Sequence, residues 1–288
     1  MDLFSIKNIK DILNRHGFHF SKSLGQNFLT ERWVCEEIAT RSDITPEDSV
    51  LEIGPGIGSL TSVLCESAGA VVAVEIDRSL LPVLSETLAE HKNVSIINSD
   101  IMKCNLKELV DNEFSGKKPK VCANLPYYIT TPILSYLIES KLFSSVTTMI
   151  QKEVAERICA APGTSEYGAF SVYVQYYTEP EYLFTVSADC FIPQPKVESA
   201  VVKLNTRETP AVSVKSEEMF FKVVKAAFAQ RRKQLANSLH SSFKNQLEKS
   251  DISGILTSLG HKPTVRGEEL SLEDFAKLSD EIYTKTQL

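Results

Sequence analysis

The tetrapeptide Asn124-Leu125-Pro126-Tyr127 brings a side-chain amide, a backbone carbonyl and an aromatic ring together within four residues. It follows an apolar run, 120–123, that predicts a buried strand, and it precedes a predicted helix. The Tyr127 ring could stack on a flat base, while the Asn124 side-chain oxygen and the Leu125 carbonyl could accept both protons of an exocyclic amine. Pro126 has no N–H, so no backbone donor competes there. This turn therefore predicts a site for an amine-bearing base, although Asn and Pro also favour ordinary turns.

A glycine-rich turn follows the first predicted strand, Ser49–Ile53, and precedes a predicted helix. Glycines such as Gly54, Gly56 and Gly58 let a ligand approach the backbone closely. A nicotinamide-binding fingerprint would place its third small residue at position 59, so the spacing disfavours a dehydrogenase. With Glu52 before it, the turn resembles the Glu-x-Gly-x-Gly-x-Gly loop of S-adenosylmethionine-dependent methyltransferases. A purely structural glycine turn is the alternative.

Acidic residues mark the ends of the second and third predicted strands. Glu75 ends the second strand, where a carboxylate could accept both hydroxyls of a ribose. Asp100 follows the third strand and could accept from an adenine amine, with Ile76 and Ile101 packing on the ring. Either acid alone could be a solvated strand-end residue. Because the carboxyl ends of parallel strands meet at one crevice, the acids and the two turns together predict one binding site.

Alternation of apolar strands and helices predicts the elements that hold these residues. Continuously apolar strands imply a mostly parallel sheet covered on both faces. Two further strands, Phe170–Thr178 and Val197–Leu204, are predicted to pair antiparallel at one edge and complete an α/β sheet of seven strands. The other predicted strands are Ser49–Ile53, Val71–Glu75, Val94–Asn98, Lys120–Asn124 and Val146–Gln151. The predicted helices here are Arg32–Arg41, Ser59–Ser67, Ser79–His91, Leu106–Asp111, Thr131–Ser140 and Glu153–Ala160.

The pattern changes near residue 205, which predicts a separate, small C-terminal helical domain. Asn205–Ser216 lacks helical periodicity and is interpreted as a linker. Only helical patterns follow it, at Glu217–Ala229, Arg231–Phe243, Ile252–Leu259 and Leu272–Lys285. We therefore expect an N-terminal extension at 1–30, a larger α/β domain at 31–205 and the helical domain at 206–288.

Composition indicates an ordinary soluble globular protein, since 43% of the 288 residues are hydrophobic and 24% are charged. No apolar run approaches the roughly 20 residues of a membrane span, and the N-terminus lacks a signal-peptide core. The six cysteines lack metal-binding spacing, which predicts a reduced cytoplasmic protein without a structural metal. The net charge of −6 argues mildly against a nucleic-acid partner, but residues 215–244 carry seven basic and two acidic side chains. That stripe could bind phosphates or be a solvated helix face.

Three further segments extend the methyltransferase resemblance. Ser23–Leu29 resembles the N-terminal motif that lies over the cofactor in ribosomal RNA adenine N6,N6-dimethyltransferases. Phe191–Val202 is similar to their late motif, and Phe228–Leu239 to the head of their C-terminal helical domain. The motifs occur in the family's order across most of the chain. The resemblance implies a Rossmann-like class I methyltransferase sheet and S-adenosyl-L-methionine as cofactor.

The resemblance also implies roles for individual residues. The cofactor pocket would be lined by Gln26, Asn27, Leu29, Gly54, Gly56, Glu75, Ile76, Asp100, Ile101 and Asn124. The target adenine would be held by Asn124, Leu125, Pro126 and Tyr127, with Phe191 covering its other face unless that ring packs in the core. Arg231, Arg232 and Lys233 would bind RNA, and the 1–30 extension would cover the cofactor site.

The implied substrate is 16S ribosomal RNA within the small (30S) subunit, where a cytoplasmic monomer would dimethylate two adjacent adenosines of the 3′-terminal hairpin. A 23S ribosomal RNA methylase that confers antibiotic resistance is a second enzyme hypothesis. A non-catalytic protein of ribosome assembly or transcription is a third hypothesis. The acidic isoelectric point of about 5.5 departs from most RNA methylases, which favours an assembling subunit over naked RNA as the substrate.

Overall fold

The computed structural model describes residues 2–21, 24–115, 117–231, 233–244 and 246–287. The chain divides into two compact units, each described here by itself. The first comprises Met1–Ala155 and Pro180–Thr206, and the second comprises Glu156–Glu179 and Arg207–Leu288. By this division, residues 156–179 belong to the second unit, although the sequence analysis assigned them to the larger α/β domain.

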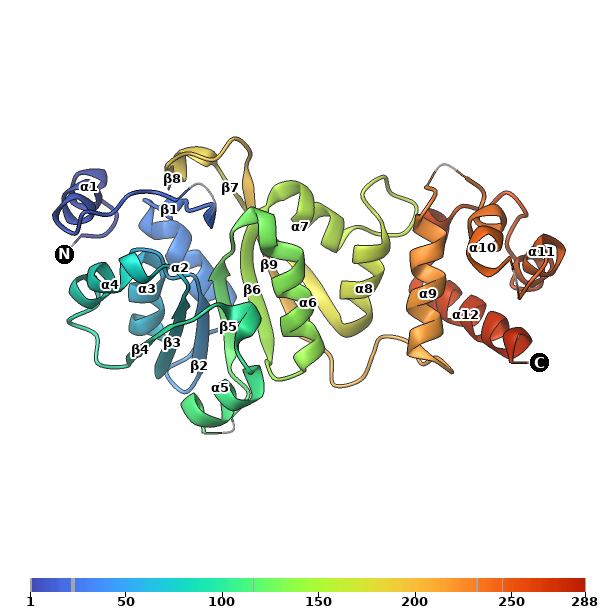
Figure 1. The fold of residues 1–288 in the computed structure, drawn as a ribbon, viewed down its shortest axis with the longest axis horizontal. Coiled ribbons are helices and arrows are strands. Elements are labelled where there is room, and N and C mark those ends of the chain that lie inside the picture. Colours follow the sequence, from blue (N-terminus) through green and yellow to red (C-terminus); the bar gives the residue numbers. More distant parts are fainter. Residues whose placement is uncertain (1, 22–23, 116, 232, 245, 288) are drawn as a thin grey trace. The chain divides into compact units, whose positions relative to one another are not determined.

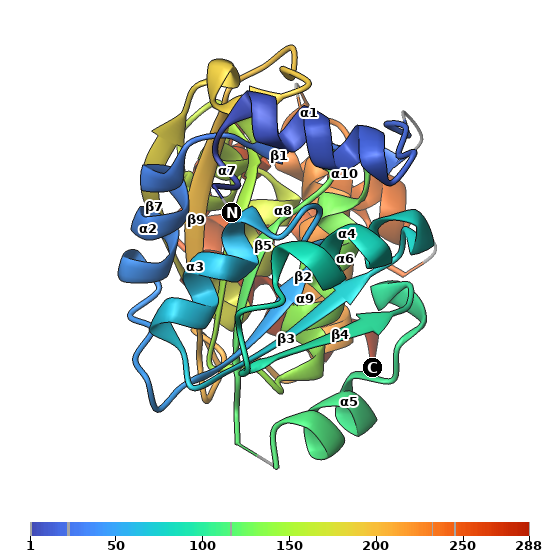
Figure 2. The same cartoon turned by 90° about the vertical axis from the view of Figure 1, so that its left-hand side faces the viewer.

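A seven-stranded sheet lies at the centre of the first unit, with the strand order β4-β3-β2-β5-β6-β9-β7 (Figures 1 and 2). Strands β4, β3, β2, β5 and β6 run parallel to one another, whereas β9 runs antiparallel to β6. The predicted mostly parallel sheet with an antiparallel edge is therefore confirmed. The strands are β2 (Ser49–Ile53), β3 (Ala70–Glu75), β4 (Val94–Asn98), β5 (Lys120–Asn124), β6 (Ser145–Gln151), β7 (Thr178–Val186) and β9 (Ser199–Thr206).

Helices cover the sheet because its central strands are mostly buried and apolar on both faces. Buried side chains of α2 and α3, such as Val34 and Leu64, pack with Val50 of β2 and Cys122 of β5. Figures 1 and 2 show α6 on the opposite side of the sheet from α2 and α3. The helices are α1 (Ile6–Arg15), α2 (Arg32–Arg41), α3 (Ser59–Ser67), α4 (Leu81–Thr87), α5 (Leu106–Glu113), α6 (Thr130–Ser140) and α7 (Lys152–Cys159).

A two-stranded sheet joins the N-terminal extension to the late motif. Residues Phe28–Leu29 form β1 and pair antiparallel with Phe191–Ile192, which form β8. Thr30 N–H also donates to the Cys190 carbonyl at 2.9 Å. Strands of two residues have too little pattern to be predicted from sequence, and neither was expected.

The second unit is helical and has its own core. Its helices are α8 (Ala169–Tyr177), α9 (Glu217–Phe228), α10 (Leu235–Phe243), α11 (Lys249–Ser258) and α12 (Leu272–Thr286). Phe220, Leu239, Ile252 and Phe275 are buried together, at 0% exposure each. The predicted small helical domain is therefore present.

The predicted strand Phe170–Thr178 is wrong, because this segment forms helix α8 and the strand β7 begins only at Thr178. The segment is rich in aromatic and β-branched residues, which favour strands. However, Val172 and Tyr176, four residues apart, both pack into the core of the second unit. An apolar run of this length does not distinguish a strand from a buried helix, and tertiary packing decides.

The predicted helix Arg231–Phe243 begins later than expected, at Leu235. Lys233 N–H closes a turn on the Gln230 carbonyl, and Leu235 N–H donates to the Val265 carbonyl. Because the Leu235 N–H is bonded to Val265, it is not available to a helix that begins earlier in the chain. Over the described residues, no helix combines the length and the apolar character that crossing a membrane requires.

Candidate active site

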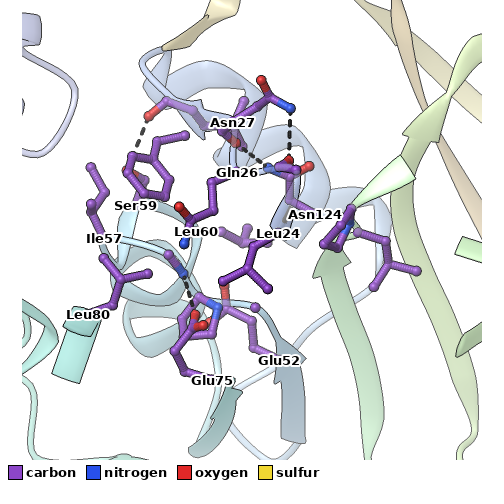
Figure 3. Close-up of a pocket in the computed structure, with 18 of the residues that line it drawn as sticks. Leu24, Gln26, Asn27, Glu52, Ile57, Ser59, Leu60, Glu75, Leu80 and Asn124 are labelled. Carbon is purple, nitrogen blue, oxygen red and sulfur yellow. Dashed lines mark hydrogen bonds between the residues drawn. The ribbon is translucent and has the colours of Figure 1, made fainter. Parts of the chain in front are cut away.

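The carboxyl ends of β2, β3 and β5 meet on one edge of the sheet, where the strand order reverses. Such a reversal creates a crevice for ligands. A cleft lies there, with about 740 Å³ of space that includes open solvent (Figure 3). Its lining includes the predicted residues Gln26, Asn27, Leu29, Gly54, Gly56, Glu75, Ile76, Asn124, Leu125, Pro126 and Tyr127.

A second cleft of about 410 Å³ shares Gly54, Ile76 and Pro126 with the first. The predicted residues Asp100 and Ile101 line this second cleft. Asp100 Oδ1 accepts from the Met102 N–H at 3.0 Å. This bond fixes the carboxylate at the N-terminus of a short 3-10 helix, Ile101–Lys103. The structure thus brings Glu75 and Asp100, the two acids predicted to bind a nucleoside, to adjoining clefts.

The glycine turn keeps the floor of the cleft open. Gly54 and Gly56 have φ angles of 70° and 61°, in the left-handed region that favours glycine. A Cβ on Gly56 would lie 3.0 Å from the Phe28 ring. The turn therefore needs glycine both for its backbone conformation and for the approach of the N-terminal segment.

Glu75 ends β3 and is only 4% exposed. Its oxygens accept from the Gly56 N–H at 3.3 Å and from the Asp77 N–H at 2.7 Å. Burial raises the pKa of Glu75 to about 7, although these backbone donors oppose the shift. Beside it, Ile76 is 50% exposed, an apolar surface that a ligand ring could cover.

Glu52 lies deeper, at 1% exposure, and also lines the first cleft. Its Oε2 atom has no hydrogen-bond partner within the described part of the chain. Burial, aided by the nearby charge of Glu75, raises the pKa of Glu52 to about 8. The Thr61 hydroxyl opposes this shift only in part, so the acid that precedes the glycine turn is a buried carboxyl with a raised pKa.

The N-terminal segment orients the Asn124 side chain. Asn124 Nδ2 donates to the Asn27 backbone carbonyl at 3.0 Å, as Figure 3 shows. Because the amide nitrogen is engaged there, Oδ1 is the end left to accept from a ligand. Leu29 is held nearby, since the Ser59 hydroxyl donates to its carbonyl at 3.2 Å.

The rest of the tetrapeptide is fixed by the neighbouring strands. Leu125 N–H donates to the Met149 carbonyl of β6 at 3.1 Å. The Tyr127 hydroxyl lies 2.7 Å from Oγ of Ser199, which is fully buried at the start of β9. Burial raises the pKa of the Tyr127 phenol, so the hydroxyl stays neutral. The tyrosine ring is thus anchored at its polar end.

Phe191 lies in the hydrophobic core with Leu29 and Val201, at 3% exposure. The described linings of the two clefts do not include it. Its role as a cover for the base stays a prediction, and core packing is the role that its contacts support.

The predicted RNA-binding residues belong to the second unit. Arg231 Nε pairs with Glu268 at 3.1 Å, and its guanidinium also donates to the carbonyls of Ser165 and Tyr167. Those contacts hold the loop before α8 within that unit. Lys233 is exposed, whereas Arg232, like Ser23 of the N-terminal motif, lies outside the described residues.

Two residues that the sequence analysis did not predict contact predicted ones. Ser199 holds Tyr127, and Asp77 accepts from Gln26 Nε2 at 2.7 Å. Asp77 lies two residues after Glu75, and Ser199 lies within the late motif. Both are therefore close in sequence to residues or motifs that the sequence analysis singled out. Sequence alone does not show which partner each one meets across the fold.

A family model described as Ribosomal RNA adenine dimethylase matches residues 17–278. The chain belongs to this family. It is therefore an enzyme that uses S-adenosyl-L-methionine to dimethylate adenine in ribosomal RNA, as the sequence resemblance predicted.

Individual relatives agree with this membership. The chain is 48% identical over 281 residues to "Ribosomal RNA small subunit methyltransferase A" of Lachnoclostridium phytofermentans, covering 97% of each protein. Among solved structures, a dimethyladenosine transferase from Plasmodium falciparum matches with a TM-score of 0.74 and 26% identity, over 90% of this chain and 98% of that one. The 23S rRNA methyltransferase ErmE matches with a TM-score of 0.69 and 25% identity, over 89% and 99%.

Asn124→Asp should abolish most activity. The aspartate has no N–H to donate to the Asn27 carbonyl, and one of its carboxylate oxygens would face that carbonyl oxygen and be repelled. We therefore expect kcat to fall about 100-fold or more. Steady-state kinetics with saturating cofactor would measure this. Asn93→Asp is the matched control, because Asn93 Nδ2 bonds the Cys65 and Ala68 carbonyls at the start of β4. That control should lower Tm with little change in kcat. Equal losses of kcat in both variants would contradict a role for Asn124 in the methyl transfer.

Ser199→Ala should release the Tyr127 ring while leaving the fold intact. We expect kcat to fall about fivefold, with a larger share of monomethylated product, because one hydrogen bond of ordinary strength is lost. Tyr127→Phe should have the same effect, and the double variant should be no worse than either. Ser145→Ala removes another buried serine hydroxyl, one without a partner among the described residues, and serves as the control. Additive losses in the double variant would contradict the anchoring role.

Glu52→Gln should change how stability depends on pH. The pKa of Glu52 is about 8 in the folded chain and about 4.5 when the chain is unfolded. Its contribution to the free energy of unfolding is therefore fully present below pH 4.5 and is lost as the pH rises through about 8. Glutamine cannot ionise, so the Tm of the variant relative to wild type should increase by roughly 2 °C or more between pH 5 and pH 9. Thermal melts at both pH values measure this, with exposed Glu47→Gln as the control. Parallel curves would show that Glu52 is not a buried, neutral acid.

Proposed function

We propose that the chain dimethylates the N6 amines of two adjacent adenosines in the 3′-terminal hairpin of 16S ribosomal RNA, acting as a cytoplasmic monomer on the small (30S) subunit. The similarity to a relative named for small-subunit RNA, over nearly the whole length of both proteins, supports this substrate. The observation that carries the chemistry is the Asn124 amide, whose nitrogen is engaged by the Asn27 carbonyl.

The two clefts fit S-adenosyl-L-methionine. Glycine at 54 and 56 leaves room against the backbone, Glu75 and Asp100 offer carboxylates, and the exposed Ile76 side chain offers an apolar face. Within this proposal, Glu75 accepts the ribose hydroxyls and Asp100 accepts from the adenine amine, beside Ile101. Gln26, Asn27, Leu29 and Asn124 line the rest of the first cleft. When bound, the cofactor supplies a methyl group already activated by a positive sulfur.

The chain's contribution to the transfer is to shape the attacking amine. The lone pair of an adenine amine is delocalised into the ring, which makes the nitrogen a poor nucleophile. Asn124 Oδ1 and the Leu125 carbonyl accept its two protons and so favour a pyramidal nitrogen with its lone pair directed outward. Tyr127, anchored by Ser199, supports the face of the base. Such positioning and exclusion of water can contribute several kcal/mol.

Proton removal needs no dedicated base in this arrangement. The described residues that line the two clefts include no histidine or cysteine. The amine proton becomes acidic as the new N–C bond forms, and it can leave to solvent. For a second transfer, the monomethyl amine must rotate and present its lone pair with only one proton left to hold. A fixed Asn124 acceptor meets that need because it requires only one N–H.

The substrate also has to present an unstacked base. Adenines in a hairpin loop leave their stack at lower cost than those in a duplex. Lys233 is exposed in the second unit and is proposed to contact RNA phosphates, together with Arg232. Arg231 is proposed to contribute mainly by holding its loop, given its three internal partners. A net charge of −6 favours an assembling subunit over naked RNA as substrate.

Methylation of small subunits that lack the hairpin modification tests the proposal. The intact chain would be incubated with these subunits and methyl-labelled S-adenosyl-L-methionine, and the label mapped by nuclease digestion and mass spectrometry. We expect dimethyladenosine at two adjacent positions of the 3′-terminal hairpin.

Large subunits and protein-free 16S RNA are the controls for that assay. Transfer to 23S RNA in large subunits instead would identify a different member of the family and reject the proposed substrate. Faster transfer to naked RNA than to subunits would reject the role proposed for the assembling particle.

A further inference from the structure

Both ends of the Gln26 side-chain amide form hydrogen bonds within the protein. Its Oε1 atom accepts from the Ser21 N–H at 2.9 Å, and its Nε2 atom donates to Asp77 Oδ2 at 2.7 Å. Gln26 also lines the first cleft, which is why the sequence analysis grouped it with cofactor-binding residues. An amide with protein partners at both ends is suited to holding the chain in place.

Asp77 connects this bond to the turn that carries Glu75. Its Oδ1 atom accepts from the Ser79 N–H at 3.0 Å and from the Ser79 hydroxyl at 2.6 Å. Its own N–H donates to Glu75 Oε1 at 2.7 Å. The other Glu75 oxygen accepts from Gly56. Gln26 is therefore attached to the same short turn that positions the ribose-binding acid.

On its other side, Gln26 adjoins the residue that orients the catalytic amide. Asn27 is the next residue, and its carbonyl accepts from Asn124 Nδ2 at 3.0 Å. The two hydrogen bonds from neighbouring positions span 51 and 97 residues of sequence. One short stretch of chain thus links the end of β3 to the end of β5.

We propose that Gln26 is a positioning residue that latches segment 24–29 onto the Glu75–Asp77 turn, so that cofactor binding at Glu75 and orientation of Asn124 depend on each other. The inference rests on the roles proposed above for Glu75 and Asn124. Coupling between the two sites then acts in both directions, as linkage requires. Gln26 acts through its protein partners and not through contact with the cofactor.

A swap of hydrogen-bonding groups tests the latch. In Gln26→Glu, one carboxylate oxygen still accepts from Ser21, but the other faces the Asp77 carboxylate and repels it. In the double variant Gln26→Glu with Asp77→Asn, the new amide oxygen still accepts from Ser79, while the new amide nitrogen donates to the carboxylate introduced at position 26. The double variant therefore restores the bond with donor and acceptor exchanged. Gln246→Glu, which adds the same charge at an exposed residue of the second unit, is the control.

Affinity for S-adenosyl-L-methionine would be measured by calorimetry without RNA, and kcat by methylation at saturating cofactor. We expect Gln26→Glu to weaken cofactor binding about tenfold and to lower kcat, and the double variant to return both to within about threefold of wild type. The Gln246→Glu control should match wild type.

Three results would overturn the latch. Unchanged affinity in Gln26→Glu means that the bond has no role in binding. A loss that Asp77→Asn does not rescue means that Gln26 contacts the cofactor itself. A loss of affinity with unchanged kcat means that the two sites are not coupled. Glu75→Ala is measured alongside: normal cofactor affinity in that variant would reject the proposed role of Glu75, separately from the latch.

Discussion

The hydrogen bond from Asn124 Nδ2 to the Asn27 carbonyl decides which end of the Asn124 side-chain amide faces the cleft. Asparagine carries a donor and an acceptor of nearly equal size, and an unconstrained side chain could present either one. The chemistry needs an acceptor, because the target amine offers only protons. A backbone carbonyl beside the nitrogen end is a simple way to enforce that choice. Under the proposed function, the N-terminal extension is therefore part of the base-holding site as well as a cover for the cofactor.

Several other features keep that carbonyl in place. The extension pairs with β8 through Phe28 and Leu29, and Ser59 and Asp77 bond it from α3 and from the turn after β3. The glycine turn allows this approach, because a Cβ at position 56 would lie only 3.0 Å from the Phe28 ring. The buried acids Glu52 and Glu75 line the same cleft, with pKa values of about 8 and about 7. The site thus combines buried acids of raised pKa with a closely fixed backbone, as an active site commonly does.

Sequence patterns predicted the parallel sheet and the cleft well, since the strand ends and their acids follow from local periodicity and from the geometry of parallel sheets. They failed where long-range packing decides. Phe170–Thr178 has strand composition but becomes α8 because Val172 and Tyr176 fill the core of the second unit. The bonds of Arg231 to a loop within its own unit were likewise not encoded locally, and its RNA-binding role stays a prediction. The Ser199–Tyr127 and Gln26–Asp77 pairs join residues 72 and 51 positions apart, and no local pattern encodes them.

A crystal structure with S-adenosylhomocysteine and adenosine bound would test the central claim most directly. The account predicts that Asn124 Nδ2 stays within about 3 Å of the Asn27 carbonyl, with Oδ1 and the Leu125 carbonyl both facing the adenine amine. If the amide instead turned its nitrogen toward the base, or if the base amine bound away from residues 124–127, the N-terminal segment would not set the orientation of the catalytic amide.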